Sequence, residues 1–123
     1  MKKIIASVLC LCCILSLFTG CKGKIEEINY EKVWALNYEK LDGTKTSKLI
    51  STTGEEFTYT VEVGTMSGSV DIVMKNDKGE IFFHKKDIPT SYITETIKSP
   101  GKFTIEATGK EHVGYISIRW DYK

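Results

Sequence analysis

The chain has 123 residues and a mass of 13.9 kDa, which is the size of a single domain. Hydrophobic residues make up 41% of it, charged residues make up 27%, and there are only 2 prolines, so a disordered or collagen-like chain is excluded. The formal net charge is +1. Because nucleic-acid binding requires a concentrated excess of lysine and arginine, this charge argues against nucleic acid as a partner.

The N-terminal segment has the pattern of a secretory signal peptide. Lys2 and Lys3 give it a positive start, and residues 4–18 carry no charge. A membrane-spanning helix needs about 20 apolar residues, so this stretch is short for a membrane span and has the length of an export signal. Two small residues, Thr19 and Gly20, and then Cys21 follow it.

Phe18-Thr19-Gly20-Cys21 resembles the lipobox of bacterial lipoproteins. In that family the cysteine thiol receives a diacylglyceryl group, and a peptidase cleaves just before it. The resemblance implies that residues 1–20 are a lipoprotein signal peptide, that Cys21 is the lipidation site and that acyl chains such as palmitate anchor the protein in a membrane. The alternative is an ordinary signal peptide that ends near a cysteine by chance.

The expected location follows from this resemblance. Loss of Lys2 and Lys3 with the signal changes the net charge from +1 to −1, so acyl chains and not charge would hold the protein at the bilayer. We expect the extracytoplasmic face of the cell membrane, and the lysine-rich chain with its short tether favours a Gram-positive source. Lys22 does not resemble the aspartate that retains lipoproteins at the Gram-negative inner membrane, so in such a cell we expect the outer membrane.

After a polar tether at residues 21–29, with one helical turn expected in it, hydrophobic residues recur with the period of two that is typical of β-strands. The sets that share one face of a strand are Trp34, Leu36 and Tyr38; Phe57, Tyr59, Val61 and Val63; Val70, Ile72 and Met74; Phe103, Ile105 and Ala107; and Ile116, Ile118, Trp120 and Tyr122. Turns are predicted at Asp42-Gly43, Thr53-Gly54, Asn76-Asp77-Lys78-Gly79, Pro89, Ser99-Pro100-Gly101 and Thr108-Gly109-Lys110. This spacing predicts an all-β fold, an antiparallel β-sandwich or jelly roll of about eight strands, over residues 30–123.

One stretch resembles a known type of sandwich. Gly68 to Met74, Asp77-Lys78-Gly79, Ser99 to Ala107 and Gly114 to Ile118 look like the successive motifs of a bacterial pre-peptidase C-terminal domain, a small jelly roll found on secreted proteins. The resemblance implies the fold and no particular function. Phe103 stands where that family has tyrosine, and its acidic calcium cluster is missing.

The residue types needed for catalysis and metal binding are sparse. All four cysteines lie within the first 21 residues, so the domain after them can form neither an intrachain disulfide nor a cysteine-based metal site. His84 and His112 belong to no metal-binding motif and are expected at the surface or at strand ends. Met66-Ser67-Gly68-Ser69 is interpreted as a turn and not as a nucleophile motif. We therefore expect no enzyme, no metal and no cofactor.

Two further groups have a functional and a structural interpretation. Asp71, Asp77, Glu80 and Asp87 flank one predicted hairpin and could bind calcium, although turn formation explains them better. Trp34, Trp120, Tyr92 and Tyr122 are the candidate ligand-binding residues, because exposed aromatic rings stack on sugars. The alternative for Trp34 and Trp120 is that they fill the core.

Three classes of function are compatible with these features. A non-catalytic binding or accessory module for an envelope polysaccharide or a membrane protein predicts an exposed aromatic or apolar patch on one sheet or along one edge strand. A structural or envelope-stress lipoprotein without a discrete ligand predicts a uniformly polar surface. An enzyme needs a deep pocket that gathers a histidine with carboxylates. The sequence favours the binding module.

Overall fold

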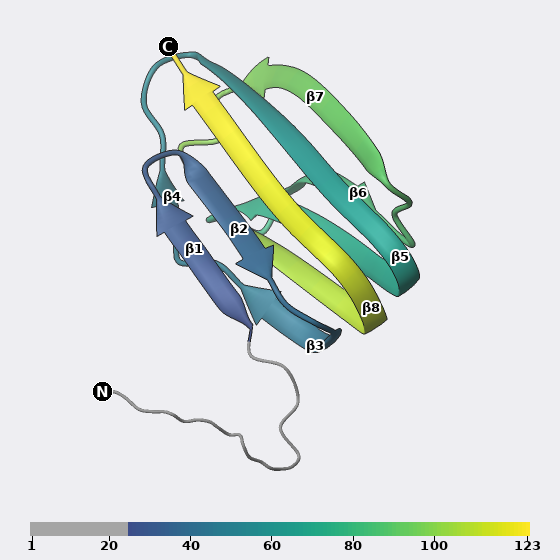
Figure 1. The fold of residues 1–123 in the computed structure, drawn as a ribbon. Coiled ribbons are helices and arrows are strands. Elements are labelled where there is room, and N and C mark those ends of the chain that lie inside the picture. Colours follow the sequence, from purple (N-terminus) through teal and green to yellow (C-terminus); the bar gives the residue numbers. More distant parts are fainter. Residues whose placement is uncertain (1–24) are drawn as a thin grey trace, which may run out of the picture.

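The computed structural model describes residues 25–123, which form eight β-strands (Figure 1). The strands are β1 (Glu26–Tyr30), β2 (Val33–Asn37), β3 (Leu41–Thr46), β4 (Ile50–Ser51), β5 (Glu56–Asn76), β6 (Ile81–Lys85), β7 (Ser91–Lys98) and β8 (Lys102–Tyr122). No helix within residues 25–123 has the length and apolar character needed to cross a membrane. The predicted signal peptide and Cys21 lie outside the described residues.

Two long strands, β5 and β8, run through both layers of a β-sandwich (Figure 1). Residues 57–65 of β5 pair with residues 114–122 of β8, and residues 69–76 pair with residues 103–110. The first layer has the order β1-β2-β8-β5-β7. The second layer has β3 and β4 beside β8, then β5, then β6. All pairings are antiparallel, so the structure confirms the predicted fold class and the number of strands.

Both long strands bend where the sequence analysis places turns. Met66-Ser67-Gly68-Ser69 and Thr108-Gly109-Lys110 lie inside continuous 21-residue strands, so the prediction of turns at these two places is wrong. The ladder shifts register between Thr65 and Ser69, which lets β5 change layers without ending. Gly68 has a φ of +74°, and a side chain there would overlap the carbonyl oxygen of Glu111 on β8.

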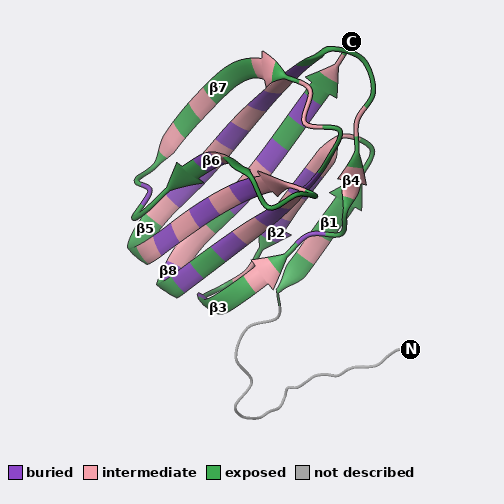
Figure 2. Cartoon of the chain, turned by 180° about the vertical axis from the view of Figure 1, so that it is seen from behind, coloured by how far each residue is buried: buried purple, intermediate pink, exposed green. Residues whose placement is uncertain are grey.

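The core lies between the two layers and is formed mainly by the alternating residues that the sequence places on shared strand faces, with Leu41, Phe83 and Ile88 in addition (Figure 2). It contains Trp34, Leu36, Leu41, Phe57, Tyr59, Val61, Val63, Val70, Ile72, Met74, Phe83, Ile88, Phe103, Ile105, Ala107, Ile116, Ile118 and Trp120. Aromatic rings from both layers pack edge to face, as Phe103 does on Trp120 with ring centroids 5.5 Å apart. Tyr38 and Tyr122, at the ends of their predicted faces, are only partly buried.

The sandwich begins earlier than the sequence predicts. Strand β1 starts at Glu26, inside the segment expected to be a tether with a helical turn, and it forms a hairpin with β2. The Glu27 side chain turns inward and accepts a 2.8 Å hydrogen bond from Trp34 Nε1, which lowers the pKa of Glu27. Lys45 Nζ of β3 lies 3.7 Å from the same carboxylate, so Glu27 joins the edges of the two layers. Pairing with β2 thus makes a strand of residues that the sequence assigns to a tether.

The hairpin between β5 and β6 agrees with the sequence analysis. Asn76 and Glu80 face each other across the turn, where the Asn76 N–H donates to the Glu80 carbonyl at 2.9 Å. Gly79 has a φ of +85°, the left-handed conformation that the turn requires. Met74 pairs with Phe83, and both side chains enter the core.

Candidate functional site

The outward side of the first layer carries the exposed tyrosines of the domain. Along each strand the side chains that alternate with core residues point outward. The strand registers place Ile28 and Tyr30 of β1, Glu62 of β5, Tyr92 of β7, and Tyr115 and Arg119 of β8 on this one side. The exposed fractions are 75% for Tyr30, 64% for Tyr92 and 41% for Tyr115. We call this surface, defined by these six residues, the tyrosine face.

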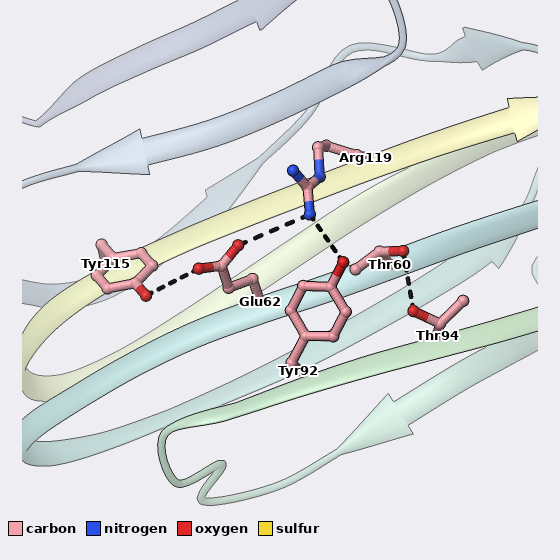
Figure 3. Close-up of polar contacts among 6 residues, drawn as sticks. All are labelled: Thr60, Glu62, Tyr92, Thr94, Tyr115 and Arg119. Carbon is pink, nitrogen blue, oxygen red and sulfur yellow. Dashed lines mark hydrogen bonds and ion pairs between the residues drawn. The ribbon is translucent and has the colours of Figure 1, made fainter.

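Four of these side chains form a polar network in the middle of the tyrosine face (Figure 3). The Tyr115 hydroxyl donates to Glu62 Oε2 at 3.0 Å. Arg119 Nη2 lies 3.8 Å from Glu62 Oε1 and donates to the Tyr92 hydroxyl at 3.3 Å. Glu62 therefore holds a tyrosine on one side and the guanidinium on the other. The hydrogen bond to Glu62 also raises the pKa of Tyr115, so this tyrosine stays protonated at neutral pH.

Tyr115 is held by a glycine beneath it. Gly64 pairs with Tyr115 across the ladder, and a side chain at Gly64 would overlap the Tyr115 ring. The ring therefore lies over the backbone of β5, in the direction of Glu62 (Figure 3). The missing side chain at position 64 is what allows Tyr115 to cross the neighbouring strand.

The β7 side of the tyrosine face is ordered by threonine pairs. Thr60 Oγ1 and Thr94 Oγ1 are 3.1 Å apart (Figure 3), and Thr58 Oγ1 and Thr96 Oγ1 are 2.8 Å apart. Such cross-strand pairs contribute roughly 0.2–1 kcal/mol each and hold an edge strand in register. They fix β7, and with it the position of Tyr92 at the edge of the sheet. The Arg119 guanidinium carbon lies 5.9 Å from the centre of the Tyr92 ring, within range of a cation–π contact.

The opposite edge of the tyrosine face is the β1–β2 hairpin. Tyr30 lies four strands away from β7, a distance of about 19 Å at the usual strand spacing. The hairpin is fastened by Lys32, whose Nζ lies 2.9 Å from Asp121 Oδ1 and 4.8 Å from the centre of the Tyr122 ring. The face is thus a flat surface bordered by tyrosines at both edges and not a deep pocket.

The four aromatic candidates from the sequence separate into three groups. Trp34 is fully buried and Trp120 is 8% exposed, so neither can stack on a ligand, and both fill the core as the alternative interpretation holds. This corrects the candidate set, because period-two alternation puts both indoles on inward faces. Tyr92 is exposed within the network, and Tyr122 is partly buried beneath Lys32. Cys21 lies outside the described residues.

The two histidines also differ from each other. His84 is exposed, in line with the sequence analysis, whereas His112 is completely buried, and its predicted surface position is wrong. His112 Nδ1 lies 2.6 Å from the Tyr38 hydroxyl and Nε2 lies 2.8 Å from Thr65 Oγ1, at the point where β8 bends. Burial lowers the pKa of His112. The polar residues next to His112 in the sequence indicate a loop, whereas β8 continues through this position.

Two aspartates of the second layer accept hydrogen bonds from backbone N–H groups. Within residues 25–123 no group of three His, Cys, Asp or Glu side chains is placed to hold a metal ion. Asp71 Oδ1 accepts a 2.8 Å hydrogen bond from the Asp87 N–H, and Asp42 Oδ1 accepts one of 3.2 Å from the Glu111 N–H. Both aspartates line a shallow hollow on the second layer together with Ser69 and Lys110. Asp71 lies in β5 and Asp42 in β3, and each holds the backbone of another segment through its hydrogen bond.

Sequence reasoning missed Tyr30, Glu62, Tyr115 and Arg119 as site residues. Alternation already places Glu62 between inward Val61 and Val63, and Arg119 between inward Ile118 and Trp120. Only the order of the strands brings these outward residues together, because β5 and β8 are neighbours while Glu62 and Arg119 are far apart in the chain.

Comparison with known proteins identifies a fold and no family. No family model matches the chain, and no curated protein matches its sequence. A chain from the disulfide-linked pili of Bacillus endospore appendages superposes with a TM-score of 0.52 at 14% identity, covering 89% of this chain and 96% of that chain. The chain is a jelly-roll β-sandwich.

Two carbohydrate-binding modules are also similar to this chain, at lower scores. The module from Cellvibrio mixtus lichenase 5A, solved with cellotriose, has a TM-score of 0.47 at 12% identity and covers 82% of this chain and 87% of its own. The C-terminal module of the Zobellia galactanivorans laminarinase LamC has a TM-score of 0.47 at 8% identity, with coverages of 77% and 87%. Neither similarity carries an argument about this chain, so the function of this sandwich has to be argued from its own surface.

Proposed function

We propose that this protein is an extracytoplasmic lipoprotein, anchored through Cys21, whose sandwich is a non-catalytic binding module for an envelope polysaccharide. The anchor and the export route rest on the lipobox resemblance at residues 18–21. We also propose that the sandwich is of the pre-peptidase C-terminal type that its sequence resembles. The observation that supports the binding role is the tyrosine face, where Tyr30, Tyr92 and Tyr115 are exposed on one side of one layer.

The chemistry of the tyrosine face suits a sugar chain. The apolar C–H faces of a pyranose ring stack on a tyrosine ring, and hydroxyl groups of the sugar need donors and acceptors beside that ring. Tyr92 supplies the ring, while Arg119 and Glu62 supply a donor and an acceptor next to it. Because Glu62 and Gly64 already hold Tyr115 and Arg119 in place, a ligand would meet an ordered surface and lose little side-chain entropy on binding.

The alternative function is a structural or envelope-stress lipoprotein without a ligand, for which a uniformly polar surface is expected. The exposed side chains of Tyr30, Tyr92 and Ile28 on the tyrosine face favour the binding module. A membrane-protein partner would use the same exposed face, and it is a separate outcome of the test below.

The test is retention of the mature, lipidated protein, purified in detergent, on immobilised envelope polysaccharides. We expect saturable binding that weakens about 2- to 13-fold in Tyr92→Ala, the loss of roughly 0.5–1.5 kcal/mol that one aromatic contact supplies. Ile81→Ala is the matched control, because Ile81 is 57% exposed but lies on β6 of the second layer. If the protein bound no polysaccharide but retained a membrane protein from a detergent extract, the partner would be that protein and not a polysaccharide.

The folded state of each variant needs a parallel measurement. Tyr92→Ala should change the free energy of unfolding by no more than about 0.5 kcal/mol, because the side chain is at the surface. Trp120→Ala should lower it by about 3–5 kcal/mol, because that indole packs in the core against Phe103. Equal polysaccharide binding by the wild type, Tyr92→Ala and Ile81→Ala would contradict a binding role for the tyrosine face.

A further inference from the structure

The first residue of the sandwich lies at the same end of the molecule as the bend of β5 and β8. Glu26 pairs with Asn37, Asn37 pairs with Tyr115, and Tyr115 pairs with Gly64, so these four residues form one row across four strands. Gly64 comes just before the bend, so the described part of the chain begins at that end of the sandwich (Figure 1). We call this the bend end.

The covalent distance from the predicted lipidation site to this row is short. Cys21 and Glu26 are five residues apart, and an extended chain spans at most about 3.6 Å per residue, or about 18 Å in total. The opposite end of the first layer, near Glu56 and Lys123, lies a further eight residues along β5, which is about 27 Å at the usual rise of a strand. A lipid on Cys21 would thus bring the bend end nearest to a bilayer.

The bend end carries the most exposed large apolar side chain among residues 25–123. Met66 is 83% exposed, and it has no partner in β8 because the ladder passes from Thr65 to Ser67. Ile25, directly before β1, is 37% exposed at the same end. An unbranched apolar side chain on a bulge is suited to enter the boundary between lipid headgroups and acyl chains.

The charges at this end do not select an anionic surface. Exposed Lys40 and Lys110 alternate with exposed Glu39 and Glu111 beside the bend. Charges of opposite sign at short spacing cancel beyond about 10 Å at ordinary ionic strength. A lipid surface would therefore be met by apolar contact at the tip and not by electrostatic attraction.

We propose that the bend end of the sandwich faces the bilayer and that Met66 inserts into its headgroup region. This inference rests on the lipid anchor of the proposed function. The tyrosine face is then perpendicular to the membrane surface. The row of Tyr92, Glu62 and Ser117 lies two residues beyond the row of Gly64, which places it about 7 Å further from the bilayer. A ligand on that face would be a polymer that runs close to the membrane surface.

The experiment places one nitroxide label on the lipidated protein in phosphatidylcholine vesicles. Met66→Cys gives the label position at the bend end, and Thr53→Cys gives a matched exposed position at the opposite end. No other thiol competes, because Cys21 carries the lipid and the remaining cysteines leave with the signal. We expect the label at position 66 to lose collisions with a water-soluble nickel chelate and to gain collisions with oxygen, while the label at position 53 keeps its nickel collisions.

Flotation of the vesicles in the same samples separates the two possible failures. If the protein floats with the vesicles and both labels collide equally with nickel, the proposed orientation is wrong and the anchor stands. If the protein does not float, the anchor itself fails and the orientation fails with it. Met66 is exposed and makes no core contact, so Met66→Cys should leave folding unchanged.

Discussion

At the scale of single residues, the buried histidine has a complete set of hydrogen-bond partners that defines its tautomer. The Thr65 hydroxyl donates to the Ile88 carbonyl at 2.8 Å, so its oxygen must accept from His112 Nε2. Nδ1 is then the acceptor for the Tyr38 hydroxyl. His112 is therefore neutral in the folded protein, and a second ring proton would lose the hydrogen bond from Tyr38.

This arrangement predicts a loss of stability in mild acid. Burial lowers the pKa of His112 in the folded state, while the unfolded chain keeps a value of about 6.5. Above about pH 6.5 both states are neutral and the stability is complete. As the pH falls below about 6.5, only the unfolded state takes up the proton, and the free energy of unfolding decreases.

Urea unfolding between about pH 8 and about pH 5 checks this prediction. His112→Gln should flatten the decline over that range, at the cost of lower stability at neutral pH, because the two partner hydroxyls lose their histidine. The exposed His84 is present in both proteins and serves as the internal control. The same slope in the wild type and the variant would assign the acid sensitivity to other groups.

At the scale of elements, the sandwich depends on two strands that bend between layers. The bend brings Gly68 of β5 against the Glu111 carbonyl of β8, with no room for a side chain and with a φ of +74°. Gly79, in the β5–β6 turn, has a similar φ of +85° but nothing close to the position of a Cβ atom. Substitution at Gly79 therefore measures the free-energy cost of the backbone conformation alone, and substitution at Gly68 adds the cost of the contact with Glu111.

Gly79→Ala should lower the free energy of unfolding by about 1 kcal/mol, the cost of a left-handed backbone in an alanine. Gly68→Ala should cost about 3 kcal/mol or more, because the two bent strands must also move apart. Urea denaturation of both variants measures the difference. Equal losses would mean that the bend opens freely and that the contact with Glu111 is not required.

At the scale of the whole molecule, β8 is the strand on which both layers depend. It pairs with β2, β3, β4 and β5, and it contributes inward side chains to both halves of the core. These pairings join residues far apart in the sequence, so folding should take milliseconds to seconds and cannot be completed before the C-terminal strand is available.

Removal of residues 114–123 should abolish cooperative folding. The truncated chain loses Ile116, Ile118 and Trp120 from the core and leaves β2 without a neighbour on its β8 side. Near-ultraviolet circular dichroism during urea titration should show no transition. A chain that lacks only Lys123 is the control and should still unfold cooperatively, because it keeps the core and loses the backbone hydrogen bonds between Lys123 and Glu55 and Glu56. A cooperative transition in the longer truncation would contradict the central role of β8.

The fold class was largely predictable because hydrophobic and polar residues alternate along most of the strands. Phe57, Tyr59, Val61 and Val63 face the core as their spacing requires, and the same rule buries Trp34 and Trp120. The errors fall where pairing with another strand overrides a local signal. Residues 26–29 are extended because they pair with β2, and the residues around Gly68 and Gly109 continue as strands because each bent strand pairs with the other.

By itself, the sequence determined the class of fold, the inward or outward direction of most strand residues, and the resemblance to a lipoprotein signal that makes Cys21 the expected anchor. Alternation is a property of neighbouring residues, so it needs no knowledge of the rest of the chain. The tertiary structure alone decided that Glu62, Tyr92, Tyr115 and Arg119 share one face and that His112 is buried. These facts depend on which strands are neighbours in the sheet. Strand order is set by the packing of the complete core, which involves all strands of the domain together.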